Sequence, residues 1–430
     1  MNKSTIIKRP GFVFVLHASL AAFGTYFCMY AFRKPFSVAT FDGLSFIGVD
    51  YKILLVIAQV LGYALSKFVG IKVISELKPN RRLLYLISLI VLAEISLLLF
   101  AWVAAPYNIP FMFLNGFPLG MIWGIVFSYI EGRRFTDILG VVLSASFIVS
   151  SGVVKSVGLF VMNSWGVSEF WMPSVTGALF FVPLLISSYL LQRVPPPTAE
   201  DIANLTERIP MTAADRKSLV KKFMFPLLII VLFYTFLTAF RDFRDNFARE
   251  LWDSIGYQGD VSVYSTSEII IAVVVLLIIG TIFYVKDNFK ALLTYHVLLI
   301  LGTLALVIST IMFQTGVLDP FVWMVCTGFG LYICYVPFNC LFFDRFIATF
   351  MVKGNSGFLI YIADAFGYLG SILVLLYKNF GQANVSWLNF FVYGTYAVAL
   401  IGIVSTSILY VHFVTRHRLE EFNKQLEYGQ

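Results

Sequence analysis

Two arginines occupy the same position in a tripeptide that occurs once in each half of the chain. The segments YAFRKPF and TAFRDFR share Ala-Phe-Arg, which ends at Arg33 and Arg241. A tyrosine stands seven residues before each arginine, at Tyr26 and Tyr234. A guanidinium is a planar fork that can hold two oxygens of one anion, which the ammonium of lysine cannot copy. The pair therefore predicts a site for an anion with several oxygens, such as a phosphate or a carboxylate.

The composition around these arginines is that of a membrane protein. Of the 430 residues, 59% are hydrophobic and 13% are charged, whereas a soluble domain carries about 25% charged residues. Apolar windows of roughly 20 residues, long enough to cross a bilayer, recur about a dozen times. The sequence contains no H-E-x-x-H, G-x-S-x-G or phosphate-binding loop motif, and its loops leave no room for a catalytic domain. We expect a protein that is not an enzyme.

The distribution of basic residues predicts the topology. The formal net charge is +7, but the basic residues lie beside apolar segments and not along one stripe, which argues against nucleic acid as a partner. Placing both termini and every second loop in the cytoplasm gathers 21 of the 31 lysines and arginines there, as the positive-inside rule requires. We expect a multi-pass protein of a bacterial inner (plasma) membrane with cytoplasmic N and C termini.

The predicted fold is an all-α membrane protein with 12 transmembrane helices in two six-helix bundles. The helices are expected at 12–41, 51–75, 83–105, 111–131, 138–162, 171–192, 223–247, 261–285, 289–313, 319–342, 347–378 and 386–415. The N-terminal bundle covers 1–192, a cytoplasmic linker with a proline triplet and a short amphipathic helix covers 193–222, and the C-terminal bundle covers 223–430. The halves align at an offset near 208, and such a parallel repeat is typical of transporters that bind substrate between their halves.

Several charged residues fall within or near the ends of these spans, namely Arg33, Lys67, Glu94, Lys155, Arg241, Arg244, Glu268, His296 and Asp364. A charge at mid-bilayer costs about 2.5 to 3.5 kcal/mol on insertion scales, so such groups face the bundle interior or an aqueous cavity. Long side chains near a span end can instead reach the interface. For the two arginines both interpretations stay open. Asp364, which precedes the small residues of ADAFGYLGS, is either a packing residue at a hinge or a proton carrier.

At these motifs the chain resembles the major facilitator superfamily, and within it the organophosphate:phosphate antiporter branch. The residues that carry the resemblance are YAFRKPF at 30–36, GYALSKF at 62–68, LGMIWG at 119–124, Tyr264 with Glu268, and FGYLGS at 366–371. The chain departs from the pattern after the second helix, at Asn246, where a carboxylate would follow Arg241 by five residues, and in the fifth helix, where Lys155 is the only ionisable group.

The resemblance implies that Arg33 and Arg241 grip a phosphoryl group, while Lys67, Lys34 and Glu268 form charge pairs that switch as the halves rock. The expected substrate-binding residues are Arg33, Arg241, Lys67, Tyr26, Tyr30, Glu268 and Tyr368. The expected gating or coupling residues are Lys34, Asp242, Asp245 and Asp364. Lys34 is expected to pair with Asp242 or Asp245 and close the outer side.

Together these features predict a secondary transporter of a small organic anion, phosphorylated and moved by exchange or ion coupling. Two alternatives stay open: a membrane sensor that binds such a ligand without moving it, and a proton-coupled carrier of sugars or peptides. We expect a monomer in the lipid bilayer whose only other partner is a small anionic substrate, with no cofactor and no metal site.

Overall fold

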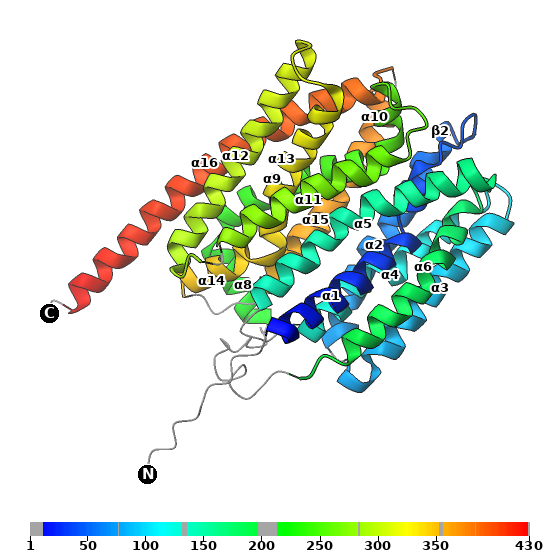
Figure 1. Ribbon diagram of the computed structural model, residues 1–430. Coiled ribbons are helices and arrows are strands. Elements are labelled where there is room, and N and C mark those ends of the chain that lie inside the picture. Colours follow the sequence, from blue (N-terminus) through cyan, green and yellow to red (C-terminus); the bar gives the residue numbers. More distant parts are fainter. Residues whose placement is uncertain are drawn as a thin grey trace.

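The protein is a bundle of membrane-spanning helices. The computed structural model describes residues 12–75, 77–130, 136–196, 213–282, 284–351, 356–382 and 384–428. Within those ranges, twelve helices are long and apolar enough to cross a membrane. The predicted all-α, multi-pass architecture is therefore confirmed (Figure 1). Residues 1–11 and 429–430 lie outside the described residues, as do 131–135 and 197–212, so the predicted positions of the two ends and of most of the linker are not described.

Each half contributes six long helices. The N-terminal half contains α1 (Phe12–Met29), α2 (Tyr51–Ser75), α3 (Arg82–Trp102), α4 (Ile109–Ile130), α5 (Thr136–Trp165) and α6 (Met172–Gln192). The C-terminal half contains α9 (Met224–Asn246), α11 (Ser262–Ile282), α12 (Asn288–Gln314), α13 (Pro320–Cys340), α15 (Ser356–Leu376) and α16 (Trp387–Tyr428). Short elements complete the chain: η1 (Tyr30–Phe32), η2 (Pro35–Val38), β1 (Ser45–Phe46), β2 (Val49–Asp50), η3 (Pro79–Arg81), α8 (Ala213–Lys222), α10 (Ala248–Ser254), α14 (Phe342–Thr349) and η4 (Tyr377–Gly381).

The two halves lie side by side (Figure 1). Within the N-terminal half α2 packs on α4 and α1 on α6, and within the C-terminal half α9 packs on α15 and α12 on α16. The halves meet along two seams, where α5 packs on α11 and α2 packs on α15. The helix α1 begins and the helix α16 ends at the same end of the bundle (Figure 1). Residues that lie at either seam therefore change their contacts when one half moves relative to the other.

The first span is not one continuous helix. We predicted a helix over 12–41, but α1 ends at Met29, and two 3-10 turns, η1 and η2, follow. Pro35 cannot donate a backbone hydrogen bond, so the hydrogen-bond pattern of α1 cannot continue through it. The amides of Arg33 and Lys34 both donate to the carbonyl of Tyr30, at 3.0 and 2.9 Å. The break places Arg33 and Lys34 on an irregular segment inside the bundle.

Two predicted boundaries in the C-terminal half are also wrong. A single helix was expected over 347–378, but α14 ends at Thr349 and α15 begins at Ser356. The last helix was expected to end at 415 and continues to Tyr428. Its polar extension carries ion pairs one turn apart, such as the 3.2 Å contact between Arg416 and Glu420, and pairs at this spacing stabilise a helix outside the apolar span.

The end of the bundle opposite to the start of α1 is closed by contacts between the halves. Lys52 at the start of α2 forms an ion pair with Glu250 of α10. Arg249 of α10 donates to the backbone carbonyl of Val38 at 2.9 Å. Lys52 also lies 5.4 Å from the ring centroid of Phe247. The short helix α10 thus fastens the C-terminal half to η2 and α2 at this end.

Glycines set the close approach of α2 and α4. A Cβ on Gly116 would lie 2.1 Å from the carbonyl oxygen of Gln59, so Gly116→Ala must push the two helices apart. Overpacking of this kind costs about 1 to 3 kcal/mol. We expect the purified variant to unfold at a lower temperature than wild type. Gly280→Ala in α11 is the matched control, because nothing lies within 4 Å of its added Cβ; equal melting temperatures for the two variants would contradict the packing argument.

Candidate functional site

Arg33 lies in a cage of tyrosines. Its guanidinium carbon is 3.8 Å from the ring centroid of Tyr63 on α2 and 5.9 Å from that of Tyr30 on η1. The ring of Tyr30 meets Tyr26 edge-on at 5.5 Å, and Tyr63 meets Tyr368 of α15 at 5.1 Å. These rings come from both halves of the chain, so the cage lies on the seam between α2 and α15.

The charge of Arg33 is not balanced inside this cage. The residue is only 6% exposed, and no carboxylate among the described residues comes within 4 Å of its guanidinium. Its Nε is buried and has no hydrogen-bond partner there. Stacking on a tyrosine face contributes attraction, but it leaves the donor edge of the guanidinium unused. A buried cation without a counter-charge is unfavourable unless an anion joins it.

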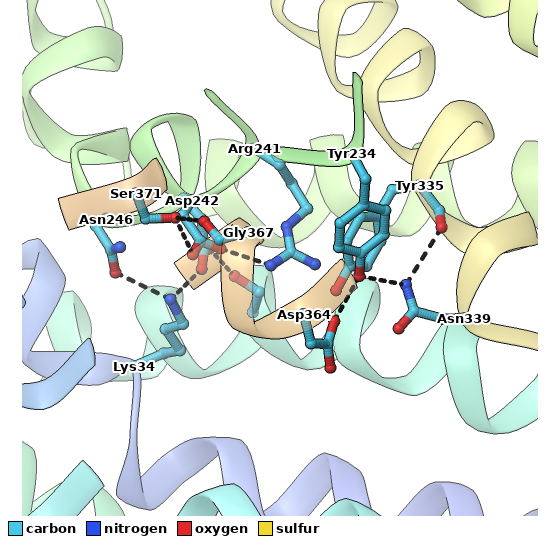
Figure 2. A network of polar contacts seen from close by, with 12 residues as sticks. Lys34, Tyr234, Arg241, Asp242, Asn246, Tyr335, Asn339, Asp364, Gly367 and Ser371 are labelled. Atoms are coloured by element: carbon cyan, nitrogen blue, oxygen red, sulfur yellow. Dashed lines mark hydrogen bonds and ion pairs between the residues drawn. The ribbon is translucent and has the colours of Figure 1, made fainter. Parts of the chain in front are cut away.

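Arg241 has a different environment. Its guanidinium stacks on Tyr335 of α13, also at 3.8 Å, but it donates to the Asp242 carboxylate at 2.6 Å (Figure 2). Asp242 accepts a second hydrogen bond from Ser371 of α15 at 2.9 Å. The Arg241 side chain is 12% exposed, so neither of the repeated arginines faces lipid. The two arginines are alike in their stacking and unlike in their charge balance.

The two arginines flank a shared set of tyrosines. Tyr30 interacts electrostatically with both Arg33 and Arg241, and so does Tyr368. These two hydroxyl groups come from η1 and α15, one in each half. An anion bound between the arginines would therefore have tyrosine hydroxyls as further hydrogen-bond donors.

An ion pair joins the halves beside this cage. Lys67 of α2 lies 3.6 Å from the Asp364 carboxylate of α15. Asp364 also accepts a hydrogen bond from Tyr234 at 2.6 Å, and Asn339 donates to the same tyrosine hydroxyl at 3.2 Å (Figure 2). Lys67 lies 5.3 Å from the ring centroid of Tyr63. We call these charged residues and the tyrosines around them the Arg33 cluster. Its members are Arg33, Lys67, Arg241, Asp242 and Asp364 with Tyr26, Tyr30, Tyr63, Tyr234, Tyr335 and Tyr368.

A second set of charges centres on Asp245. This carboxylate accepts from Lys34, from Lys155 and from the hydroxyl of Ser151. Lys34 also donates to Asn246 at 2.9 Å (Figure 2). The expected contact between Lys34 and an acid of the seventh span is present, and the acid is Asp245. All of these side chains are buried, so one carboxylate is shared by two lysines of the opposite half and balances the charge of only one of them.

Glu268 belongs to this second set and not to the Arg33 cluster. It forms a 2.5 Å ion pair with Arg244, which also donates to the carbonyl of Met324 at 3.1 Å. Gly152 of α5 lies so close that an added Cβ would be 2.8 Å from the Cβ of Glu268. Lys34, Ser151, Lys155, Arg244, Asp245 and Glu268 form what we call the Asp245 cluster. Tyr332 interacts electrostatically with charges of both clusters.

A small pocket opens beside the Asp245 cluster. Its lining residues are Gly152, Lys155, Arg244, Ala248, Trp252, Tyr264, Glu268 and Met324. They come from α5 in one half and from α9, α10, α11 and α13 in the other. The pocket therefore lies on the seam between α5 and α11, near the closed end.

The two clusters together hold an excess of positive charge. Six basic groups face four carboxylates, namely Arg33, Lys34, Lys67, Lys155, Arg241 and Arg244 against Asp242, Asp245, Glu268 and Asp364. Two positive charges remain without a counter-charge among the described residues. Such an excess in the bundle interior favours an anionic guest.

Sequence reasoning missed several of these residues. Lys155 was visible as a charge inside an apolar span, but no role was assigned to it because its partner, Asp245, belongs to the other half. Arg244 was likewise recognised only as a charge. Tyr335, whose ring stacks on Arg241, gave no signal in the sequence.

A family model covers residues 35–416, nearly the whole described chain. The chain belongs to the family DUF5690. That family is described as one of unknown function, so membership does not assign an activity to either cluster. Among curated proteins, none matches this chain in sequence.

Solved structures identify the fold of this DUF5690 protein. A D-xylose-proton symporter matches with a TM-score of 0.60 at 16% identity, covering 93% of this chain and 97% of the other. A bacterial homologue of the human drug peptide transporters PepT1 and PepT2 matches with 0.62 at 12% identity, covering 94% and 99%. The nucleoside transporter NupG matches with 0.60 at 15% identity, covering 92% and 98%. The fold is that of the major facilitator transporters.

Proposed function

We propose that this protein is a secondary transporter of a small organic anion, most simply one with a phosphoryl group, and that it works by alternating access. The observation that carries the proposal is the state of Arg33. Its guanidinium is buried, is oriented by Tyr63 and has no carboxylate partner among the described residues. A multi-oxygen anion would accept from its free donor edge in the bidentate geometry that guanidinium favours.

The charge of the two clusters supports a doubly charged substrate. Each cluster holds one positive charge in excess, and the sum of two matches a phosphate monoester, which carries about −1.5 to −2 at neutral pH. A bound ester would neutralise Arg33 directly. The tyrosines 26, 30 and 368 would donate hydrogen bonds to its remaining oxygens or to its organic part.

The contacts between the halves support alternating access. Ion pairs across the seams, such as those of Lys34 and Lys67, can separate and re-form as the halves rock. The structural neighbours whose names state a cargo are carriers of xylose with a proton, of nucleosides and of peptides. Their shared fold supports transport by this chain, while the choice of an anion rests on Arg33.

Counterflow in liposomes tests the proposal. Purified protein is reconstituted into vesicles loaded with inorganic phosphate, and the uptake of labelled phosphate and of labelled phosphate esters is measured. We expect uptake well above that of protein-free vesicles for at least one of these anions. Arg193→Lys is the matched control, because Arg193 is an exposed arginine at the end of α6 and bonds to Tyr189, so its uptake should equal that of wild type.

The same preparation separates transport from sensing. A thermal-shift screen with the same anions reports binding, because a ligand of the native state raises the apparent stability. Binding without uptake would contradict transport and support the sensor. If none of these anions is bound or taken up, the anion site itself is contradicted.

A further inference from the structure

Glu94 is a half-buried residue of the N-terminal half and is not part of either cluster. It projects from α3 towards α6, where its Oε1 accepts from the hydroxyl of Ser174 at 2.5 Å. Its Oε2 is buried and has no hydrogen-bond partner among the described residues. The backbone of Gly177 lies so close that an added Cβ would be 2.4 Å from Oε2 and 3.0 Å from the ring of Phe32. Glu94 therefore fills a tight site between α3, α6 and η1.

Among the described residues, no basic group forms an ion pair with Glu94. The helices α4 and α6 contain no charged residue, and Glu94 is the only charged residue of α3 beyond its first residue, Arg82. On α1, His17 bonds to the carbonyl of Leu190. The next cation along the chain, Arg33, stacks on Tyr63. Ser174 is thus the one polar side chain that the described structure gives to this carboxyl group.

A carboxylate in such surroundings takes up a proton instead of remaining charged. The unpartnered Oε2 is the atom on which that proton can reside. We propose that Glu94 is a proton-binding site of this protein and that its protonation positions Arg33. Binding converts the carboxylate and one proton to the neutral acid, and release reverses the step, so no other reactant is needed. The proton site itself follows from the contacts of Glu94, whereas its link to an anion rests on the function proposed above.

Two buried amides connect Glu94 to Arg33. Asn115 of α4 donates to the carbonyl of Ala93, the neighbour of Glu94, at 3.1 Å and to the carbonyl of Phe32 at 2.9 Å. Gln59 of α2 donates to the Asn115 side chain at 2.8 Å and to the carbonyl of Arg33 at 2.9 Å. The turn of α3 that carries Glu94 and the broken segment that carries Arg33 are therefore held by one hydrogen-bond network.

This network gives the proton an effect on the anion site. The carboxyl group lies close to Gly177 and to the ring of Phe32, where a neutral acid needs no counter-charge. A negative charge at the same place must gain water or a cation, which requires α3, α6 or Phe32 to move. Because Asn115 holds the carbonyl of Phe32 and Gln59 holds that of Arg33, such a movement displaces the guanidinium. Protonated Glu94 is thus the state that holds Arg33 on Tyr63.

Infrared difference spectroscopy tests the proton site without any substrate. Spectra of the purified protein are recorded as the pH is raised, and the C=O band of a protonated carboxyl group is followed. We expect wild type to lose such a band at alkaline pH and Glu94→Gln to lack it. Glu169→Gln is the matched control, because Glu169 is a carboxylate held by the backbone amides of Thr40 and Phe41. An unchanged band in Glu94→Gln would overturn the proposal.

A second variant keeps the test decisive if Glu94→Gln does not fold. Ser174→Ala removes the hydrogen bond to Oε1, which should move the carboxyl band to higher frequency, and a band that does not move would overturn the assignment. The coupling is tested by the affinity for inorganic phosphate, which itself changes from monoanion to dianion near neutral pH, so wild type and Glu94→Gln are compared at each pH. We expect the ratio of the two affinities to change with pH, and a ratio that is the same at every pH would overturn the coupling. If neither phosphate nor any phosphate ester binds at any pH, the proposed function is contradicted and the infrared result alone decides the proton site.

Discussion

Replacing Arg33 with lysine should weaken the binding of phosphate and its esters about ten- to a hundredfold, because a hydrogen bond to a charged group contributes about 1.5 to 3 kcal/mol. Lysine keeps the charge but loses the planar fork and the stacking on Tyr63. The fold should persist, since among the described residues Arg33 makes no ion pair that lysine would break. Titration of purified protein with inorganic phosphate and with phosphate esters measures the loss.

Arg241→Lys should also weaken the binding of phosphate and its esters, but Arg241, unlike Arg33, has a carboxylate partner. Arg241 already pairs with Asp242, so its fork is partly occupied before any anion arrives. Lysine at this position would keep the pair and lose the stacking on Tyr335. Arg193→Lys is the control for the effect that an arginine-to-lysine substitution has on affinity away from the site. Affinity that is undiminished in both the Arg33 and the Arg241 variants would remove the arginines from the site, and a loss as large in Arg193→Lys would show a general effect of the substitution.

Much of the fold could be predicted from hydropathy, because twenty apolar residues have few alternatives to a spanning helix. The breaks could not. An apolar window averages over Tyr30 to Val38, where α1 has ended and the two 3-10 turns η1 and η2 flank Arg33 and Lys34. The same averaging joined α14 to α15. Hydropathy thus locates a span but not the interruption inside it that forms the site.

The candidate site was predictable as a set of charges and not as a set of contacts. Charges in apolar spans are visible in sequence, and the repeat indicated that Arg33 and Arg241 belong together. Their environments differ because Asp242 follows Arg241 while Lys34 follows Arg33. The repeat could not show this consequence, since a duplicated backbone does not require duplicated partners. Contacts such as that of Lys155 with Asp245 depend on the seam between halves.

The missing partner of Glu94 could not be predicted from the sequence either. In sequence it is a single acid in an apolar span, and such a residue can equally well face a cation. Only the packing of α4 and α6, which bring no charged residue to α3, distinguishes a lone carboxyl group from half of an ion pair. The absence of a partner is a property of neighbouring helices, and it becomes visible only when those helices are placed.

Asp245→Asn should have the largest effect on stability of any single change considered. Asp245 is the counter-charge for both Lys34 and Lys155, and all three side chains are buried. Removing one partner of a buried ion pair costs about 3 to 5 kcal/mol, because the remaining charge is left without compensation. Thermal unfolding of the purified variant measures the loss. Asp253→Asn is the matched control, since Asp253 pairs with Arg249 at a more exposed position where such pairs contribute about 0 to 1 kcal/mol.

The same substitution should loosen the closed end of the bundle. Lys34 and Lys155 belong to the N-terminal half and Asp245 to the C-terminal half, so loss of the carboxylate replaces attraction across the seam with repulsion between two lysines. Ala248, buried on α10 next to this cluster, can report the change as a cysteine in a background without the native cysteines. We expect a thiol reagent to label Ala248→Cys faster when Asp245→Asn is present than when Asp253→Asn is present.

A third substitution separates the effect of charge from that of shape. If uncompensated lysine is the cause, adding Lys155→Met to Asp245→Asn should restore part of the lost stability and slow the labelling, because Lys34 keeps its hydrogen bond to Asn246 and one buried charge has been removed. If asparagine simply packs poorly at position 245, the double variant should be no more stable than the single one. That second outcome, or labelling equal to that of the Asp253→Asn control, would show that Asp245 does not hold the halves together.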